Sequence, residues 1–288
     1  MKQIVTIVLA VLASVLSVKF LLPQGGEAAV AKETAYERVM RTGVLRCGYG
    51  LWPHAMERDV NTGKMSGIIV EITEALAASL NLKVEWASEV DWGQIPTALD
   101  TQKIDMHCAG LWADPGKARG MAFSDPIFFS KVSAIARADD TRFDNNMAAM
   151  NKPEIKTPFG DGEINLEIAM HDIPLATRVP KASVNGDQGL LQDVAFGRAD
   201  VTFSNSSEVM VFNANNPDKQ LKVVPLPKPV RLFANTYGLG KDEHTLRNML
   251  NVALHVLQEN GQLDKILAKY KGKGAELFTP VQRRYSEE

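Results

Sequence analysis

The sequence runs VLRCGY at residues 44–49, IIVEITEALAASL at 68–80, KVEW at 83–86 and IDMHCA at 104–109. In the second of these stretches, isoleucine and leucine recur at helical spacing from Ile69 to Leu80, whereas the other three are short and are typical of strands. Strands that alternate with helices in this way predict a parallel sheet joined by crossover helices. This part of the chain therefore predicts an α/β protein.

A second alternation follows an irregular segment. FSDP at residues 123–126 interrupts the alternation of strands and helices, and residues 131–137 are predicted to be extended. Residues 139–158 are polar and rich in methionine, which is typical of an irregular surface segment. Beyond them we expect strands at Ile164–Met170, 199–204, 221–224 and 236–239, and helices at 190–196, 246–257 and 263–270. The chain thus contains two α/β halves.

Length and composition narrow the function classes. The 288 residues are 45% hydrophobic, which is enough for one large or two small domains with a buried core. The formal net charge of −2 resembles neither a basic nucleic-acid surface nor an acidic tail. We therefore expect no nucleic-acid partner.

The first 31 residues differ in character from the rest. Lys2 supplies a positive charge, residues 4–18 form a short apolar run, and residues 29–31 (AVA) are small, as a signal peptidase requires. This is the layout of an export signal. The alternative is an uncleaved membrane anchor, but the shortness of the run and Lys19 favour cleavage. Residues 1–31 are therefore predicted to be a signal peptide or an N-terminal anchor.

The chain has two cysteines, Cys47 and Cys108. Spacing alone does not decide whether they pair or stay as buried thiols. They form no CxxC motif and no cysteine–histidine cluster, and the five histidines show no metal-ligand spacing or triad arrangement. We therefore expect no metal and no cofactor.

Two α/β halves joined by extended segments predict a cleft between them. In α/β sheets ligands bind beyond the carboxyl ends of the strands, and domain interfaces are a second preferred site. The loops that follow the predicted strands at such a cleft are 50–54, 110–119, 159–163 and 204–207.

Ordered motifs run through nearly the whole mature chain. They are GIIVEI (67–72), IPTAL (95–99), KIDM (103–106) followed by Gly110, FSDP (123–126), GRADV (197–201), and NGQLDKI (260–266) followed by Lys269-Tyr270. In this order and spacing they resemble the bacterial extracellular solute-binding proteins of family 3, the amino-acid-binding proteins of ABC importers.

The resemblance implies a type II periplasmic-binding-protein fold. In it two α/β lobes, each a mostly parallel sheet flanked by helices, are joined by two crossing strands and close on the ligand by a hinge. The first crossing falls near residues 130–136 and the return near 232–239. We therefore expect lobe 1 to comprise residues 32–130 and 236–288, and lobe 2 to comprise residues 131–235.

The resemblance also implies two charged anchors for the ligand. In the amino-acid binders an arginine at the helix opening after the third strand grips the ligand carboxylate, and an aspartate in the second lobe binds its ammonium. Lys117 and Asn205 stand at these positions here. Lysine holds an anion only as a point charge, and asparagine has no charge to offset an ammonium. The ligand therefore need not be a standard amino acid.

Alternatives to these two anchors lie nearby. Lys117 is either an anchor or a solvated helix residue, and Arg119 is close enough in sequence to replace it. Glu208 can replace Asn205, although we expect Glu208 to face solvent or the helix dipole.

Four further residues of the first lobe belong to the predicted site. Gly110 opens the loop after the third strand, and Trp112 can stack on a planar or cationic group. Trp52 stands where the family often has an aromatic wall, with loop packing as the alternative. Asp114 is either a ligand contact or, as the following Pro115 favours, the N-cap of a helix.

Three residues of the second lobe complete it. Gly162 and Glu163 resemble a glycine turn whose backbone meets the ligand in some relatives. Arg231 lies near the hinge, where it can reach an anion or bridge the lobes.

These observations predict a periplasmic solute-binding component of an ABC import system. It would bind a small polar metabolite, namely an amino acid or an amino-acid-like or organic acid, by hinge closure. Its partners would be this ligand and the permease subunits of the transporter, with membrane contact only through an uncleaved N-terminal segment, and it would be a monomer.

Two alternatives remain open. The first is an enzyme similar to the periplasmic cyclohexadienyl dehydratases of this family, for which Glu163, Asp114 and Glu208 are the candidate acids. The second is a ligand-sensing module that signals to a partner.

Overall fold

A parallel sheet forms from the alternation at residues 44–109. β1 (Val44–Tyr49) pairs in parallel with β4 (Lys83–Glu89) and with β5 (Met106–Trp112). α3 (Ile68–Ser79) connects β1 to β4 and buries its apolar face, including Ile72, against the sheet. The predicted crossover helix and its two flanking strands are therefore confirmed.

The structure is a computed structural model that describes residues 32–160, 163–181, 186–270 and 278–281. The described residues from Ala35 onward form one compact unit. The predicted signal or anchor lies outside the described residues. None of the described helices combines the length and the apolar composition needed to cross a membrane.

Shorter elements surround the parallel sheet. They are α2 (Ala35–Thr42), β2 (Glu57–Arg58), β3 (Met65–Ser66), a 3-10 turn at Trp92–Gln94, α4 (Ile95–Asp100), α5 (Pro115–Ala118) and β6 (Met121–Phe123). Gly67, directly before α3, has a φ of 118°, and a Cβ there would lie 2.5 Å from the Ala55 carbonyl oxygen. Only glycine fits at this helix start.

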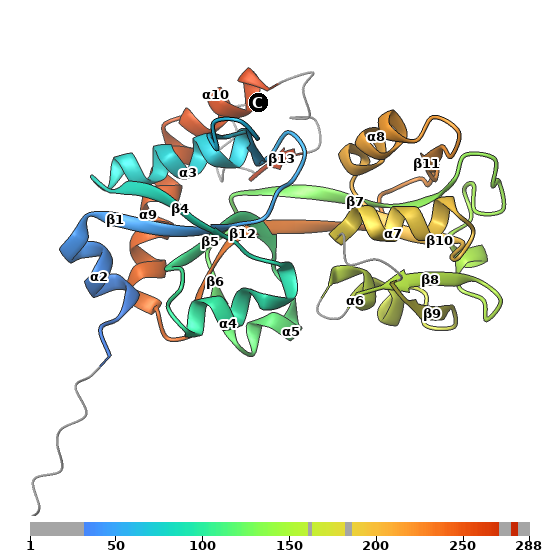
Figure 1. The fold of residues 1–288 in the computed structure, drawn as a ribbon, viewed down its shortest axis with the longest axis horizontal. Coiled ribbons are helices and arrows are strands. Elements are labelled where there is room, and N and C mark those ends of the chain that lie inside the picture. Colours follow the sequence, from blue (N-terminus) through green and yellow to red (C-terminus); the bar gives the residue numbers. More distant parts are fainter. Residues whose placement is uncertain (1–31, 161–162, 182–185, 271–277, 282–288) are drawn as a thin grey trace, which may run out of the picture. The chain divides into compact units, whose positions relative to one another are not determined.

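Two long strands, β7 (Phe128–Arg137) and β12 (Arg231–Gly240), run between two lobes (Figure 1). They pair antiparallel with each other, and β12 continues beside β5 and β6. β7 continues beside β10 (Val201–Ser204) and β11 (Leu221–Val223). One sheet, in the strand order β10-β7-β12-β5-β1-β4, therefore extends through both lobes.

The second lobe adds a smaller parallel pair and three helices. These elements are a 3-10 turn at Met147–Met150, β8 (Lys156–Phe159), α6 (Ile164–His171), β9 (Thr177–Pro180), α7 (Gly186–Ala195) and α8 (Ser206–Asn215). The strand predicted at Ile164–Met170 is wrong, because these residues form α6. Ile164 and Ile168 are buried one helical turn apart, and a short apolar run of this length does not distinguish a strand from a helix.

The C-terminal helices pack in the core of the first lobe. α9 (His244–Glu259) and α10 (Gln262–Lys269) pack against α3, and their buried leucines join the same core. Gly261 separates the two helices in a left-handed conformation with a φ of 74°. A short strand, β13 (Phe278–Pro280), then pairs with β7.

The buried residues divide between the two lobes. The first lobe draws its core from residues between 35 and 128 and from residues between 237 and 278. The second lobe draws its core from residues between 132 and 233. Both crossing strands therefore contribute side chains to both cores.

A buried carboxylate ties α2 to the sheet. The Asp105 side chain has no exposed surface and accepts hydrogen bonds from Arg38 Nε and from Arg46 Nη2, each at 2.8 Å. Asp105 Oδ2 also accepts the backbone N–H of Arg46 at 2.8 Å. A buried charge is tolerated when it is paired in this way.

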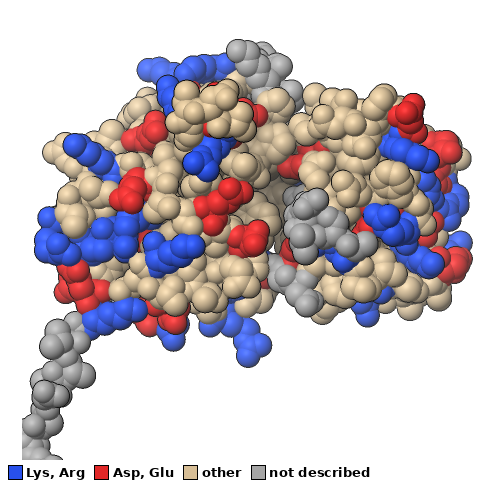
Figure 2. Space-filling model, in the orientation of Figure 1, with Lys and Arg blue, Asp and Glu red and all other residues tan. Residues whose placement is uncertain are grey.

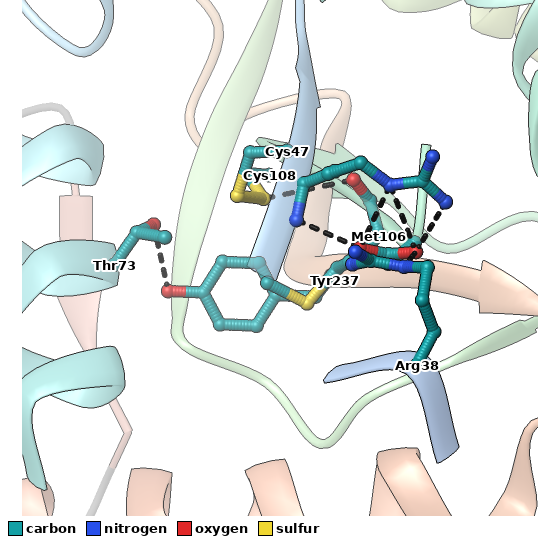
Figure 3. The surroundings of a disulfide bond; sticks show 8 residues. Arg38, Cys47, Thr73, Met106, Cys108 and Tyr237 are labelled. Atoms are coloured by element: carbon teal, nitrogen blue, oxygen red, sulfur yellow. Dashed lines mark hydrogen bonds and ion pairs between the residues drawn. A yellow bond between two sulfur atoms is a disulfide. The ribbon is translucent and has the colours of Figure 1, made fainter. Parts of the chain in front are cut away.

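Cys47 of β1 and Cys108 of β5 form a disulfide, with Cα atoms 5.6 Å apart (Figure 3). The structure thus decides between the two states that the sequence left open. The bond joins neighbouring strands of the first lobe, and beside it Tyr237 Oη and Thr73 Oγ1 share a hydrogen bond of 3.1 Å.

Loss of this disulfide should destabilise the chain. The two cysteines are 61 residues apart in sequence, and the entropy of the unfolded loop predicts a loss of about 4 kcal/mol in the free energy of unfolding. Urea denaturation of the oxidised protein, the reduced protein and the Cys47→Ala/Cys108→Ala variant measures this loss. The reductant should not affect the double variant, and an equal midpoint for the oxidised and reduced wild-type protein would contradict the prediction.

Candidate functional site

A pocket of about 590 Å³, including space open to solvent, lies between the lobes. Its lining residues are Leu51, Trp52, Trp92, Gly110, Leu111, Trp112, Asp114, Lys117, Glu163, Ile164, Asn205 and Glu208. The first eight come from the first lobe and the last four from the second. Away from the pocket, charges of both signs are scattered over the visible surface of both lobes (Figure 2).

Seven of the nine residues predicted for the site meet in this pocket. They are Trp52, Gly110, Trp112, Asp114, Lys117, Glu163 and Asn205. Gly162 lies outside the described residues. Arg231 is not among the described lining residues, and its guanidinium pairs with Asp172 Oδ2 at 2.7 Å within the second lobe.

Aromatic rings form one wall of the pocket. Trp52 is 6% exposed and meets Trp112 edge to face, with ring centroids 6.3 Å apart. Trp112 stacks on Phe233 of β12 at 5.2 Å with an interplanar angle of 16°. Trp92 lines the pocket beside them and meets His107 at 5.6 Å. Such a wall suits planar or cationic ligand groups.

Trp112 is also tied to both crossing strands by hydrogen bonds. Its Nε1 donates to Ser130 Oγ of β7 at 2.7 Å, and Asn235 Nδ2 of β12 donates to the same oxygen at 2.9 Å. The orientation of the indole therefore depends on the place where the two crossing strands pair.

Asp114 and Lys117 form a closed pair at the start of α5. Asp114 Oδ1 accepts the backbone N–H of Lys117 at 2.9 Å, which confirms the N-cap favoured from the sequence. Asp114 Oδ2 lies 2.9 Å from Lys117 Nζ. The ammonium expected at the anchor position is thus neutralised by a carboxylate on its own helix.

Glu163 is neutralised as well. Its Oε1 lies 2.5 Å from Lys181 Nζ, and the side chains of both residues are largely buried. Its Oε2 is buried without a hydrogen-bond partner among the described residues. A ligand N–H could occupy that acceptor, because a buried oxygen gains most from a donor.

Asn205 caps α8 at the pocket. Its Oδ1 accepts the backbone N–H of Glu208 at 3.2 Å and a hydrogen bond from Ser207 Oγ. The side chain lies where the resemblance predicted an anchor, but its acceptor oxygen already holds the start of the helix.

Glu208 is a further charged residue of the pocket, where the sequence offers it as an alternative to Asn205. We expected it to face solvent or the helix dipole, but it is 6% exposed and lines the pocket. Its carboxylate accepts a hydrogen bond from the amide of Gln188 on α7. Burial raises the pKa of the Glu208 carboxyl above its ordinary value, and the hydrogen bond from Gln188 opposes this. The sequence signal for a pocket position of Glu208 is its place in the first turn of a helix that directly follows a strand.

His107 lies behind the pocket and has a different character. Both ring nitrogens are buried without a hydrogen-bond partner among the described residues. Burial, with a smaller contribution from Lys117, lowers the pKa of His107 to about 3, so the ring is neutral. The described residues include no group of histidine, cysteine or acidic side chains arranged to hold a metal ion.

Comparison with known families adds a match over most of the chain. The family described as bacterial extracellular solute-binding proteins, family 3, matches residues 46–273. A probable histidine-binding protein of Neisseria gonorrhoeae is 27% identical over 216 residues, which cover 73% of this chain and 76% of that protein.

Two further similarities are to an enzyme and to an ancestral binding protein. Membrane-bound lytic murein transglycosylase F of Salmonella typhi is 23% identical over 221 residues, covering 75% of this chain but 45% of the enzyme. The crystal structure of the ancestral amino acid-binding protein AncCDT-1, a precursor of cyclohexadienyl dehydratase, has a TM-score of 0.67 and 24% identity. That similarity covers 82% of this chain and 99% of AncCDT-1.

The buried Glu208 should make stability depend on pH. The pKa of the Glu208 carboxyl is raised in the folded chain, so ionisation of this group lowers the free energy of unfolding. The loss is absent below the ordinary carboxyl pKa and grows as pH rises from that value to the pKa in the folded chain. The Glu208→Gln variant should therefore unfold at a higher urea concentration than wild type at pH 8. The gain should be about 1.4 kcal/mol for each pH unit of pKa shift.

Urea titrations between pH 4 and pH 8 test this, with Glu74→Gln as the matched control because Glu74 is exposed on α3. The advantage of Glu208→Gln should disappear toward pH 4. A constant difference across this range, or a variant less stable at pH 8, would show that the carboxylate is not desolvated.

Proposed function

The chain belongs to the bacterial extracellular solute-binding proteins of family 3, and we propose that it captures a small polar metabolite bearing a cationic group between its lobes and delivers it to the permease of an ABC importer. The observation that carries the proposal is Glu208, a buried carboxylate that lines the pocket.

Glu208 is the pocket carboxylate that we expect to pair with a cationic group of the ligand, because the other two pocket carboxylates already pair with lysines. Asp114 is paired with Lys117, and Glu163 is paired with Lys181. Among the described residues, the partner of Glu208 is the neutral amide of Gln188. A buried carboxylate without a cation is unfavourable, so a ligand ammonium or guanidinium there would gain binding energy.

The aromatic wall supports the same ligand class. Trp52, Trp92 and Trp112 line the pocket that contains Glu208. Indole faces attract cations, and the attraction strengthens as water is excluded. A simple organic acid would instead bring a second negative charge beside Glu208. We therefore favour an amino-acid-like compound or an amine over an organic acid.

Closure of the two lobes about a hinge would bring the second-lobe side of the pocket, which includes Glu163 and Glu208, against the ligand. Lobe 1 would comprise residues 32–130 and 236–288, and lobe 2 residues 131–235, with the hinge in the crossing strands. The contacts of Trp112 with Ser130 and Phe233 support this, because they link a pocket residue to both crossing strands.

Export to the periplasm completes the proposal, with residues 1–31 as the cleaved signal. The disulfide between Cys47 and Cys108 supports it, because disulfides persist mainly in oxidising compartments. The relative from Neisseria gonorrhoeae, described as a probable histidine-binding protein, supports a nitrogen-containing ligand.

One observation favours a second function, that of a dehydratase. A carboxyl whose pKa is raised by burial can stay protonated and act as a general acid. In a cyclohexadienyl substrate Glu208 would donate its proton to the leaving hydroxyl, which departs as water while the ring carboxylate leaves as carbon dioxide.

The charge of Glu208 should decide ligand affinity. Thermal-shift and calorimetric titrations would screen histidine, arginine, agmatine, putrescine and succinate, since a ligand that prefers the folded state raises the melting temperature. At least one of the cationic compounds should bind, and Glu208→Gln should weaken its binding by about 30-fold or more.

Glu74→Gln is the control and should bind like wild type. Arginine and agmatine differ by the carboxylate, so their ratio reports whether Lys117 leaves Asp114 for the ligand. Preferential binding of succinate, or equal affinity of wild type and Glu208→Gln, would refute a cation site at Glu208.

The dehydratase function has its own test. If Glu208 is a general acid, wild type should convert prephenate or arogenate to the aromatic product, and Glu208→Gln should lose about 100-fold or more of that rate. Ultraviolet absorbance of the aromatic product measures turnover. No turnover by wild type, together with binding of a cation, would leave solute capture as the function.

A further inference from the structure

The C-terminal segment adds a strand beyond the family match. The match ends at residue 273, and the described residues beyond it form β13 (Phe278–Pro280). β13 pairs antiparallel with the first crossing strand, with Phe278 opposite Ser130 and Pro280 opposite Phe128. The same residues of β7 pair with β12 on their other side. β7 is therefore enclosed on both edges where it leaves the first lobe.

Phe278 brings this strand to the pocket. Its side chain is buried, and its ring lies 4.4 Å from that of Phe128 and 5.4 Å from that of Trp52, edge to face in both cases. Trp52 lines the pocket on the other side of this contact. The chain beyond residue 273 thus contacts a pocket residue directly.

Trp52 depends on ring contacts for its orientation. Its Nε1 is buried without a hydrogen-bond partner among the described residues, whereas Trp112 has Ser130 as its acceptor. The aromatic neighbours of Trp52 are Trp112 and Phe278. Edge-to-face contacts favour particular ring angles, so each neighbour restricts the indole of Trp52.

The two tryptophans are linked through β13. Phe278 contacts the ring of Trp52, and its register partner is Ser130, whose hydroxyl holds the Trp112 indole. We propose that β13 is a positioning element of the pocket and that Phe278 is the positioning residue for Trp52. The C-terminal segment is then part of the binding machinery, although it contributes no residue to the described pocket lining.

Fluorine NMR of protein labelled with 5-fluorotryptophan tests this without a ligand. The chain has four tryptophans, so four resonances are expected, and Trp52→Phe identifies that of Trp52. Phe278→Ala should shift and broaden the Trp52 resonance. Trp86, whose ring meets Tyr49 instead, should stay unchanged and serves as the internal control.

Two further variants separate positioning from general stability. Phe278→Tyr keeps the ring and should retain the Trp52 resonance, which also protects the test if Phe278→Ala fails to fold. Phe196→Ala removes an exposed phenylalanine of the second lobe and should change none of the four resonances. An unchanged Trp52 resonance in Phe278→Ala, or equal changes at all four tryptophans, would overturn the proposal.

The affinity measurement rests on the proposed function. For the strongest binder among histidine, arginine, agmatine and putrescine, Phe278→Ala should raise the Kd about three- to tenfold, because the aromatic pair that orients Trp52 is lost. Phe278→Tyr, which keeps the ring, should raise the Kd less than Phe278→Ala does. If none of these compounds binds wild type, solute capture of a cation fails, while the fluorine spectra still decide the role of Phe278. An unchanged Kd in Phe278→Ala would confine β13 to a structural role.

Discussion

The antiparallel pairing of β7 with β12 is the constraint on which the rest of the structure depends. Its register sets Phe128 opposite Asn235 and Val132 opposite Arg231, and thereby fixes where the chain passes from one core to the other. The same register brings Ser130 and Asn235 together behind Trp112. A slip by one residue would turn Ser130 to the opposite face of the sheet and remove the acceptor of the indole N–H. The pocket wall and the connection between the lobes are thus one assembly.

The pocket balances stability against binding. Lys117 pairs with Asp114 at 2.9 Å, and the pocket residue Glu163 pairs with Lys181 at 2.5 Å, which keeps these buried charges tolerable. Among the described residues, the Glu208 carboxylate receives a hydrogen bond from the Gln188 amide and pairs with no cation, and its burial disfavours the charged form. Natural proteins accept such local instability where the site uses it. The charge that weakens the empty protein is therefore the one that would select its ligand.

The sequence predicts the long periodic elements well and the local contacts poorly. α3 and α9 follow from their apolar spacing, and the motifs around residues 95–126 and 260–270 indicate the two-lobed fold. The short run at Ile164–His171 carries no decisive period, so its helix was missed. Lys117 and Arg231 are candidate ligand contacts by sequence, and in the structure they pair with Asp114 and Asp172, a local pairing that sequence spacing does not reveal. Glu208 becomes a pocket residue only through the packing of α7 on α8, which is a tertiary contact that spacing does not encode.

The discontinuity of the first lobe has a consequence for how the chain matures. β5 pairs with β12, and α3 packs against α9 and α10. The whole second lobe separates each of these partners from β5 and α3 in sequence, so these contacts form only after the second lobe has been synthesised. Because the N-terminus is made first and, on the proposed route, exported first, residues 35–128 are available before β12, α9 and α10 and present an open sheet edge and an uncovered helix face. Contacts of such long sequence separation form late, and exposed edges are prone to misassembly until they do. The second lobe can gather its core earlier, so the nascent chain is vulnerable mainly in the part that is synthesised first.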